Sequence, residues 1–319
     1  MLLGEHAVLD GGNALVCAID QRIEVILSPR FDLTIDIISS LGRYETCITH
    51  IDVAPPFQFV LETIKHYQPH LTQGFTLTIT SGFSEKLGLG SSAAVTVATL
   101  SALLRFLNKF VDHSDLIKQA TRIIQSVQGL GSGADVAASV LGGMVDYRQT
   151  PFHAEKLLFT YPITLVYSGF KTPTPIVVNQ VRALFSKNLD DFEKIKKEIN
   201  LCAVNGIQMA RDNNPTELGQ AMTAQQHWMN ALGVNTPLLQ SIVDELQSNT
   251  EIKGAKISGS GLGDCIVGLG RMTKSEWLAC HPERSEGSCS NEEILRFAKD
   301  DNMGTYIAVQ MTTQGVMCE

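Results

Sequence analysis

The chain has 319 residues, of which 44% are hydrophobic and 18% charged, the proportions of an ordinary globular protein with a sizeable core. Its net charge of −8 argues against a nucleic-acid-binding surface, because basic residues are not in excess. No apolar run is long enough to span a bilayer, and the N-terminus lacks the pattern of a signal peptide. The seven cysteines are odd in number and show no CxxC spacing, which predicts reduced thiols in a cytoplasmic protein.

The first 80 residues predict a sheet-rich region with one helix. A short segment, Gly4–Gly12, comes first, and its polar Glu5 and His6 either line a site or lie in a solvated turn. Pro55-Pro56 predicts the start of a helix that ends near Tyr67, since proline is tolerated in the first helical turn. Alternating or apolar runs predict strands over residues 14–19, 22–27, 33–38 and 75–80.

A glycine loop, Lys86–Ala94, follows these strands and opens a helix that continues through the apolar run Val95–Phe106. Gly88 and Gly90 carry no Cβ, so the backbone can turn sharply there and approach another molecule closely. A serine is expected to cap the helix. The unpaired N–H groups and the positive end of the helix dipole would suit a phosphate, although the same pattern also fits a plain turn before a core helix.

A second glycine-serine loop, Gly129–Gly133, lies between two predicted helices. The helix before it is capped by Asp112 or Ser114, and the helix after it carries Asp135 in its first turn. A carboxylate beside a phosphate-binding loop can accept a proton from an attacking hydroxyl or hold Mg²⁺. The alternative is that Asp135 only interacts favourably with the helix dipole.

Beyond residue 155 the composition changes, and we place a domain boundary there. The predicted elements are a strand over 163–167 and helices over 176–185, 189–211, 215–232 and 236–248. A third glycine-serine loop, Lys256–Cys265, has three glycines in five residues and lies between two strand-like runs. It again favours close approach of the backbone to a ligand.

Three segments, Gly4–Gly12, Gly88–Ala94 and Lys256–Cys265, resemble the GHMP kinase superfamily in their motifs and in their order. The resemblance implies an α+β fold with two domains, and ATP and substrate bound between them. An N-terminal ATP-binding domain (1–155) would contain a left-handed βαβ unit, and a C-terminal domain (156–319) would be ferredoxin-like. It also implies a cytoplasmic ATP- and Mg²⁺-dependent kinase with a small-molecule substrate, no nucleic-acid or membrane partner, and a homodimer as in many related kinases.

The resemblance also assigns roles to residues for an in-line phosphoryl transfer. Asp135 would be the catalytic residue that orients or deprotonates the substrate hydroxyl, and Ser92 would reach Mg²⁺. The ATP phosphates would contact Lys86, Gly88, Leu89, Gly90, Ser91, Ser92 and Ala93. The substrate would contact Glu5, His6, Ser258, Gly259, Ser260 and Gly261.

The phosphoryl acceptor is less strongly marked than the kinase motifs. The stretch Gly4–Leu9 resembles mevalonate kinases, in which the position of His6 contacts the substrate, whereas Gln128–Gly133, Tyr167–Gly169 and Gly263–Cys265 are closer to phosphomevalonate kinases. We expect ATP-dependent phosphorylation of mevalonate in isoprenoid biosynthesis. Phosphomevalonate is the alternative acceptor, and a catalytically weak ATP-binding remnant of a GHMP kinase is the alternative function.

Three features depart from the family pattern. Related kinases carry a strand with a Pro-Gly-Lys stretch before the first motif, so either the printed start is misplaced or this strand and its lysine are absent. Mevalonate kinases have a Mg²⁺-binding glutamate where this chain has Ile124-Gln125. Residues 280–303 resemble a translated bacterial repeat element and predict a surface insertion with a short helix over 292–299.

Overall fold

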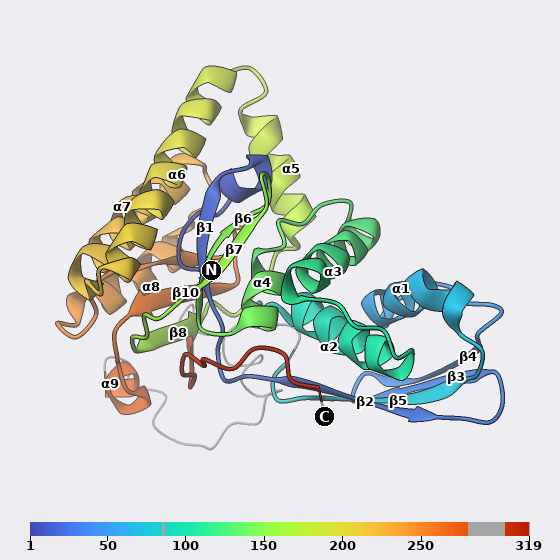
Figure 1. The fold of residues 1–319 in the computed structure, drawn as a ribbon. Coiled ribbons are helices and arrows are strands. Elements are labelled where there is room, and N and C mark those ends of the chain that lie inside the picture. Colours follow the sequence, from blue (N-terminus) through green and yellow to red (C-terminus); the bar gives the residue numbers. More distant parts are fainter. Residues whose placement is uncertain (85–86, 280–303, 319) are drawn as a thin grey trace. The chain divides into compact units, whose positions relative to one another are not determined.

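The computed structural model describes residues 1–84, 87–279 and 304–318. These residues form two compact units that interleave along the chain. The first unit comprises residues 1–20, 87–89, 143–279 and 304–313, and the second comprises 21–84, 90–142 and 314–318. Figure 1 labels the helices and strands of both units.

Strand pairing explains why the first 20 residues belong to the first unit. Strand β1 (Asn13–Cys17) pairs antiparallel with β6 (Met144–Arg148), and β6 pairs antiparallel with β7 (His153–Leu157). The N-terminal segment therefore packs with residues that follow it by more than a hundred positions. The predicted domain boundary at residue 155 stays a prediction. Each compact unit combines several separate segments of the chain, so the units do not correspond to one N-terminal and one C-terminal half.

The second sheet of the first unit has four strands in the order β11-β8-β10-β9, with every neighbouring pair antiparallel. Helices separate β8 from β9 and β10 from β11, which gives the ferredoxin-like β-α-β-β-α-β order that was predicted. The α+β fold class is thus confirmed. The strands are β8 (Ile163–Tyr167), β9 (Ala255–Ser258), β10 (Cys265–Leu269) and β11 (Thr305–Ile307).

Helices of the first unit bury their apolar faces against this sheet. Fully buried Ile199, Val243, Ile257 and Ile266 belong to one hydrophobic cluster built from helices and strands. Asn214 and Thr236 cap α7 and α8 by accepting from Glu217 N at 3.2 Å and Leu239 N at 3.3 Å. The helices are η1 (Ala7–Asp10), α5 (Thr174–Leu184), α6 (Leu189–Arg211), α7 (Pro215–Ala231), α8 (Pro237–Ser248) and α9 (Lys274–Ala279).

The second unit is a four-stranded sheet with helices on one face (Figure 1). The strand order is β2-β5-β3-β4, and β3 pairs parallel with β5 through a connection that contains helix α1, which makes a βαβ unit. The strands are β2 (Ile23–Pro29), β3 (Thr34–Ser39), β4 (Gly42–Cys47) and β5 (Phe75–Ser81). The helices are α1 (Gln58–Tyr67), η2 (Gln68–His70), α2 (Ser91–Phe106), α3 (His113–Gln128) and α4 (Ala134–Leu141).

Local expectations were mostly confirmed, with one wrong cap. Asp112 caps α3 by accepting from Asp115 N at 2.8 Å. The serine expected to cap α2 does not do so, because the cap is Gly90 in the left-handed region at φ 74°, which places both serines inside the helix. Strands β4, β6 and β7 were not predicted. The helix expected over 292–299 and the predicted phosphate ligand Lys86 lie outside the described residues.

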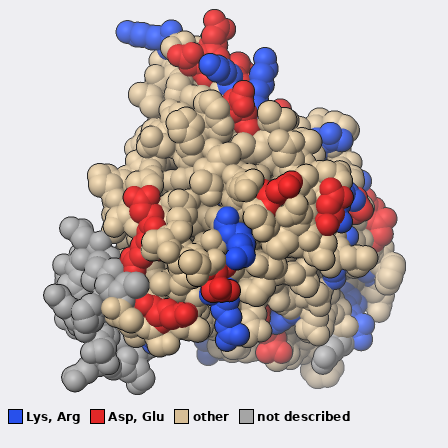
Figure 2. All heavy atoms as spheres, turned by 90° about the vertical axis from the view of Figure 1, so that its left-hand side faces the viewer, with Lys and Arg blue, Asp and Glu red and all other residues tan. Residues whose placement is uncertain are grey.

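The surface and helix lengths bear on two classes of partner. No helix in the described ranges is both long and apolar enough to cross a membrane. On the face drawn in Figure 2, acidic and basic side chains of the described residues are interspersed among wide uncharged areas. The absence of a nucleic-acid partner stays a prediction.

Gly219 tests the packing of α7 against the turn that leads to β9. A Cβ at this position would lie 2.1 Å from the carbonyl oxygen of Lys253. Gly219→Ala should therefore lower the free energy of unfolding by about 1–3 kcal/mol through overpacking, although alanine is the better helix former. Urea denaturation measures this.

The matched control is Ala224→Gly, at an exposed position on the same helix. It should cost about 1 kcal/mol through helix propensity alone. A stabilised Gly219→Ala variant would contradict the close approach of α7 to Lys253.

Candidate active site

In the second unit, the N-terminus of α2 is open to an external acceptor. Gly90 takes the N-cap position, and no side chain caps the helix. The backbone N–H groups of its first turn, which begins with the half-buried Ser91 and Ser92, have no partner within the helix. A helix start of this kind suits an anion, and a phosphate in particular.

Asp135 lies next to this helix start within the same unit. It is exposed in the first turn of α4, whose N-cap Gly133 has φ 82°. A Cβ placed on Gly90 would be 3.6 Å from Asp135 Oδ2. Glycine at this position therefore leaves room beside the carboxylate. The structure brings together the predicted phosphate-binding turn and the predicted catalytic carboxylate.

The loop before Asp135 is held by side chains of the described residues. Gln125 Nε2 donates to Gly131 O at 2.7 Å, and Ser132 Oγ accepts from Ala134 N at 3.3 Å. Gln125 thus makes a structural contact where related kinases place a carboxylate. The Ser92 hydroxyl and the Asp135 carboxylate are oxygen donors of the kind that Mg²⁺ takes, and Mg²⁺ binding here stays a prediction.

In the first unit, the first and third motifs meet around a buried ion pair. Lys256 Nζ contacts Glu5 Oε1 at 2.5 Å, and the two side chains are 0% and 2% exposed. Gln225 of α7 donates through Nε2 to Glu5 Oε2 at 2.5 Å and accepts through Oε1 from Gly4 N at 2.9 Å. Gly259 N approaches Glu5 Oε1 at 3.4 Å. Both carboxylate oxygens of Glu5 are therefore engaged inside the protein.

His6 stands beside this pair and contacts the third motif directly. Its Nε2 lies 2.8 Å from Ser260 O, and because a carbonyl can only accept, Nε2 carries the hydrogen and Nδ1 is an acceptor. Burial lowers the pKa of His6 below its ordinary value, and the contacts with Ser260 and Glu5 oppose this effect. The imidazole is therefore neutral at neutral pH.

The third motif forms a tight loop after β9. The buried Ser260 hydroxyl has no hydrogen-bond partner among the described residues, so it can serve a ligand. A Cβ on Gly261 would lie 2.5 Å from Val234 Cβ, which explains the glycine. Thr172 Oγ1 donates to Leu262 O at 2.5 Å and ties a neighbouring loop to this one.

The start of the second motif lies against the end of the third, also within the first unit. A Cβ on Gly88 would lie 2.6 Å from Asp264 Oδ1. Cys265 Sγ donates to Leu87 O at 3.1 Å, and burial raises the pKa of this thiol, so it stays protonated. Gly88 and Leu89 belong to the first unit, and Gly90, Ser91, Ser92 and Ala93 to the second.

Sequence reasoning missed Lys256 and Gln225 as members of this cluster. Lys256 is the first residue of the third motif, but its charge gave no sign that it would be fully buried. Gln225 lies in the middle of a helix with no motif around it. Its part in the cluster is evident only from its hydrogen bonds with Glu5 and Gly4, which lie 220 and 221 positions earlier in the chain.

A group of potential metal ligands elsewhere in the first unit is an ion-pair network. Asp146, His153 and Glu155 of the β6–β7 hairpin have ligand atoms within 4.8 Å of one another. Arg211 of α6 lies 2.9 Å from Asp146 Oδ2 and 2.6 Å from Glu155 Oε2. Its guanidinium already neutralises the carboxylates, so we assign no metal to this cluster.

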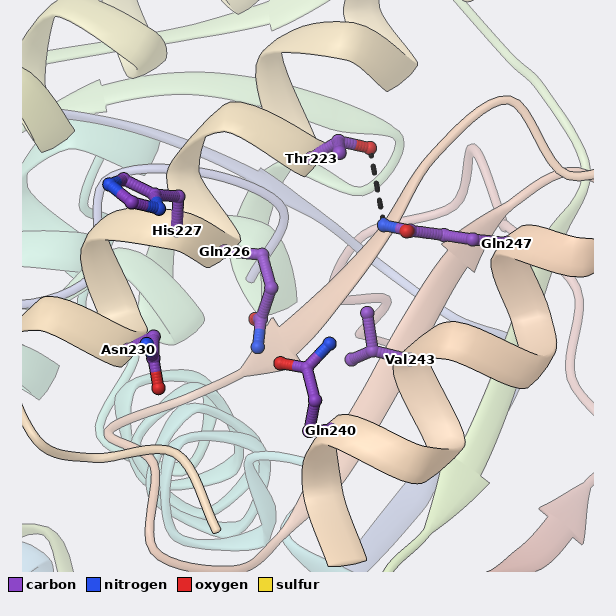
Figure 3. A pocket seen from close by; sticks show the side chains of 7 residues that line it. All are labelled: Thr223, Gln226, His227, Asn230, Gln240, Val243 and Gln247. Carbon is purple, nitrogen blue, oxygen red and sulfur yellow. Dashed lines mark hydrogen bonds between the residues drawn. The ribbon is translucent and has the colours of Figure 1, made fainter. Parts of the chain in front are cut away.

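A cavity of about 230 Å³ lies between α7 and α8 (Figure 3). The side chains that line this cavity include no Lys, Arg, Asp or Glu, so the cavity offers no permanently charged group to a phosphate. Gln226 on its wall also accepts from Ile257 N at 3.0 Å and so holds β9. The lining residues are Thr223, Gln226, His227, Asn230, Gln240, Val243 and Gln247.

Two family models match this chain. One, described as GHMP kinases N terminal domain, matches residues 58–143, and the other, GHMP kinases C terminal, matches residues 207–276. The first covers α1 to α4, which includes the α2 start and Asp135. The second covers α7, α8 and the Lys256–Cys265 loop.

Known relatives span nearly the whole chain. The mevalonate kinase of Thermococcus onnurineus is 28% identical over 86% of this chain and 88% of its own length. That of Saccharolobus solfataricus is 27% identical over 93% of this chain and 96% of its own length. The crystal structure of the Methanococcus jannaschii mevalonate kinase has a TM-score of 0.76 at 24% identity, covering 97% of this chain and 95% of that one, and shares the fold.

The buried imidazole of His6 predicts a pH dependence of stability. Its pKa is lowered on folding, so below about pH 6.5 the unfolded chain binds a proton that the folded chain does not. The free energy of unfolding should therefore fall as pH drops below that value, and His6→Gln should reduce this slope. Urea titrations at about pH 7.5 and about pH 5.5 measure both slopes.

His70→Gln, which removes an exposed imidazole from η2, is the matched control. It should leave the slope closer to that of the unsubstituted chain. An equal slope in the His6→Gln variant and the unsubstituted chain would argue against a buried neutral His6.

Proposed function

This chain belongs to the GHMP kinases, and on that premise we propose that it transfers the γ-phosphoryl group of ATP to the hydroxyl of mevalonate. The observation that carries the proposal is the position of Asp135 beside the uncapped start of α2. Mevalonate as the acceptor is supported by the names of relatives that span most of the chain. The cytoplasmic location and the homodimer stay predictions.

The second unit supplies phosphate binding and the catalytic carboxylate. The N–H groups of Ser91 and Ser92 bind phosphate oxygens, and the α2 dipole lowers the energy of negative charge there. Ser92 Oγ would hold Mg²⁺, which when bound neutralises charge on the transferred group. Asp135 orients the acceptor hydroxyl and takes its proton as the new P–O bond forms. The bond between the γ-phosphorus and the β,γ-bridging oxygen breaks at the same time, and ADP leaves.

The first unit supplies acceptor binding. Neutral His6 presents Nδ1 as an acceptor, and Ser260 offers a hydroxyl that has no other partner among the described residues. Because the Glu5 carboxylate is fully engaged, we propose that it positions this segment and does not contact the acceptor. Gly259 and Gly261 allow the backbone of the loop to approach closely.

The first test measures ADP release with Mg²⁺–ATP, offering mevalonate and 5-phosphomevalonate in parallel. We expect turnover with mevalonate only. Turnover with 5-phosphomevalonate alone would replace the acceptor and keep the kinase. ATP binding without turnover on either acceptor would favour the remnant.

Asp135→Asn tests the catalytic carboxylate. Loss of the proton acceptor should lower kcat by at least about 100-fold, while the dissociation constant for ATP changes little. Asp115→Asn is the matched control, because Asp115 is likewise exposed in the first turn of a helix of the same unit. Equal kcat values for the two variants would remove Asp135 from the reaction.

Ser92→Ala tests the proposed Mg²⁺ ligand. It should raise the Mg²⁺ concentration needed for half-maximal activity, because one oxygen donor is lost. A Mg²⁺ titration of initial rates measures the shift. An unchanged midpoint would contradict the assignment of Ser92.

A further inference from the structure

We propose that Lys256 and Gln225 are positioning residues that act through Glu5 to hold the His6 segment against the Ser258–Gly263 loop and thereby set the affinity for the phosphoryl acceptor. The proposal rests on the proposed kinase function for its kinetic consequence. Its structural part stands on contacts within the first unit alone.

One carboxylate joins three distant parts of the chain. Glu5 pairs with Lys256, which is 251 residues away, and accepts from Gln225, which is 220 residues away. Lys256 Nζ also donates to Ile257 O, at the end of β9. Besides the ion pair, the Lys256 ammonium group therefore has a partner in β9, and the Glu5 carboxylate has a partner in α7. The pair fixes the distance between the first and third motifs.

The segment around His6 needs such a restraint. Gly4 and His6 both lie at positive φ, 97° and 62°, and a left-handed conformation costs free energy for a residue with a side chain. Gln225 Oε1 accepts from Gly4 N on one side of Glu5, and His6 contacts Ser260 O on the other. The network therefore holds the backbone on both sides of the ion pair.

Helix α7 contributes a second restraint on the same loop. Gln226, next to Gln225, accepts from Ile257 N at 3.0 Å, between Lys256 and Ser258. Figure 3 shows Gln226 projecting from α7 towards α8, beside Gln240. Two consecutive glutamines of one helix thus bind the two motifs whose residues are predicted to contact the acceptor.

Stability alone does not explain a pair of charges in this position. A buried ion pair is often replaceable by apolar residues with no loss of stability, because desolvation offsets the attraction. Removing one member, in contrast, leaves an uncompensated charge. A double substitution therefore separates positioning from folding, because it restores neutrality inside the protein.

The experiment compares Lys256→Met, Glu5→Gln and the double variant with the unsubstituted chain. Each single variant should have a lowered Tm, and the double variant should recover most of that loss. In the double variant, KM for the acceptor should stay raised by about tenfold, since a misplaced binding group weakens a productive contact. KM for ATP should change less than about twofold, because the hydrogen-bond partners of Glu5 and Lys256 among the described residues include none of the predicted phosphate ligands.

Lys196→Met is the matched control. Lys196 Nζ lies 2.7 Å from Asp10 Oδ2, so this ion pair also joins a lysine to the Gly4–Gly12 segment. Asp10 is near the end of that segment that is remote from Glu5. This variant should keep both KM values. A double variant that recovers both Tm and acceptor KM would overturn positioning and leave a structural ion pair.

A second readout does not depend on turnover. The titration of His6, followed by NMR and assigned with His6→Gln, reports burial of the imidazole among Glu5, Asp10 and Lys256. In the double variant the pKa of His6 should move up towards its ordinary value, because a loosened segment admits water and burial is the main cause of the lowered pKa. The removed charges of Glu5 and Lys256 act on the pKa of His6 in opposite directions. An unchanged titration would overturn the proposal even if neither acceptor is turned over. Absence of turnover in the unsubstituted chain, with the titration shifted as expected, would refute only the kinase function.

Discussion

The ion pair of Glu5 and Lys256 is the contact on which the proposed acceptor-binding residues of the first unit depend. It joins Glu5, just before η1, to strand β9, which leads into the Ser258–Gly263 loop. Charges buried this deeply are tolerated only when paired and hydrogen-bonded, so the pair specifies a narrow range of backbone positions. The contact between His6 Nε2 and Ser260 O depends on these backbone positions.

The proposed phosphate-binding start of α2 depends on backbone groups instead of buried charges. Gly90 starts α2 without a side-chain cap, so the N–H groups of the first turn remain for a ligand. A glycine in the left-handed region precedes each of two helices, Gly90 before α2 and Gly133 before α4. Asp135 lies beside the α2 start, where a Cβ on Gly90 would be in van der Waals contact with its carboxylate.

Much of the fold was predictable from sequence because its signals are local. Helix periodicity gave α6 as Leu189–Arg211, and the apolar run Ile163–Tyr167 gave β8. Strands β6 and β7 were not predicted because their short sequences mix charged and apolar residues. Pairing of β6 with β1 and of β7 with β6 stabilises them. The cap of α2 was misassigned because a serine after glycine is a common cap, whereas here the glycine itself takes that position.

The site was predictable only in its loops. Glycine and serine patterns identify backbone that approaches a ligand, but they do not show which buried side chains hold that backbone. Gln225 illustrates the limit, because its role needs an amide that donates to Glu5 while accepting from Gly4 N. A glutamate in its place would lose the donor and put a second negative charge beside the first. The identity of this helix residue is set by two partners more than 200 positions away, so a local pattern has no means of encoding it.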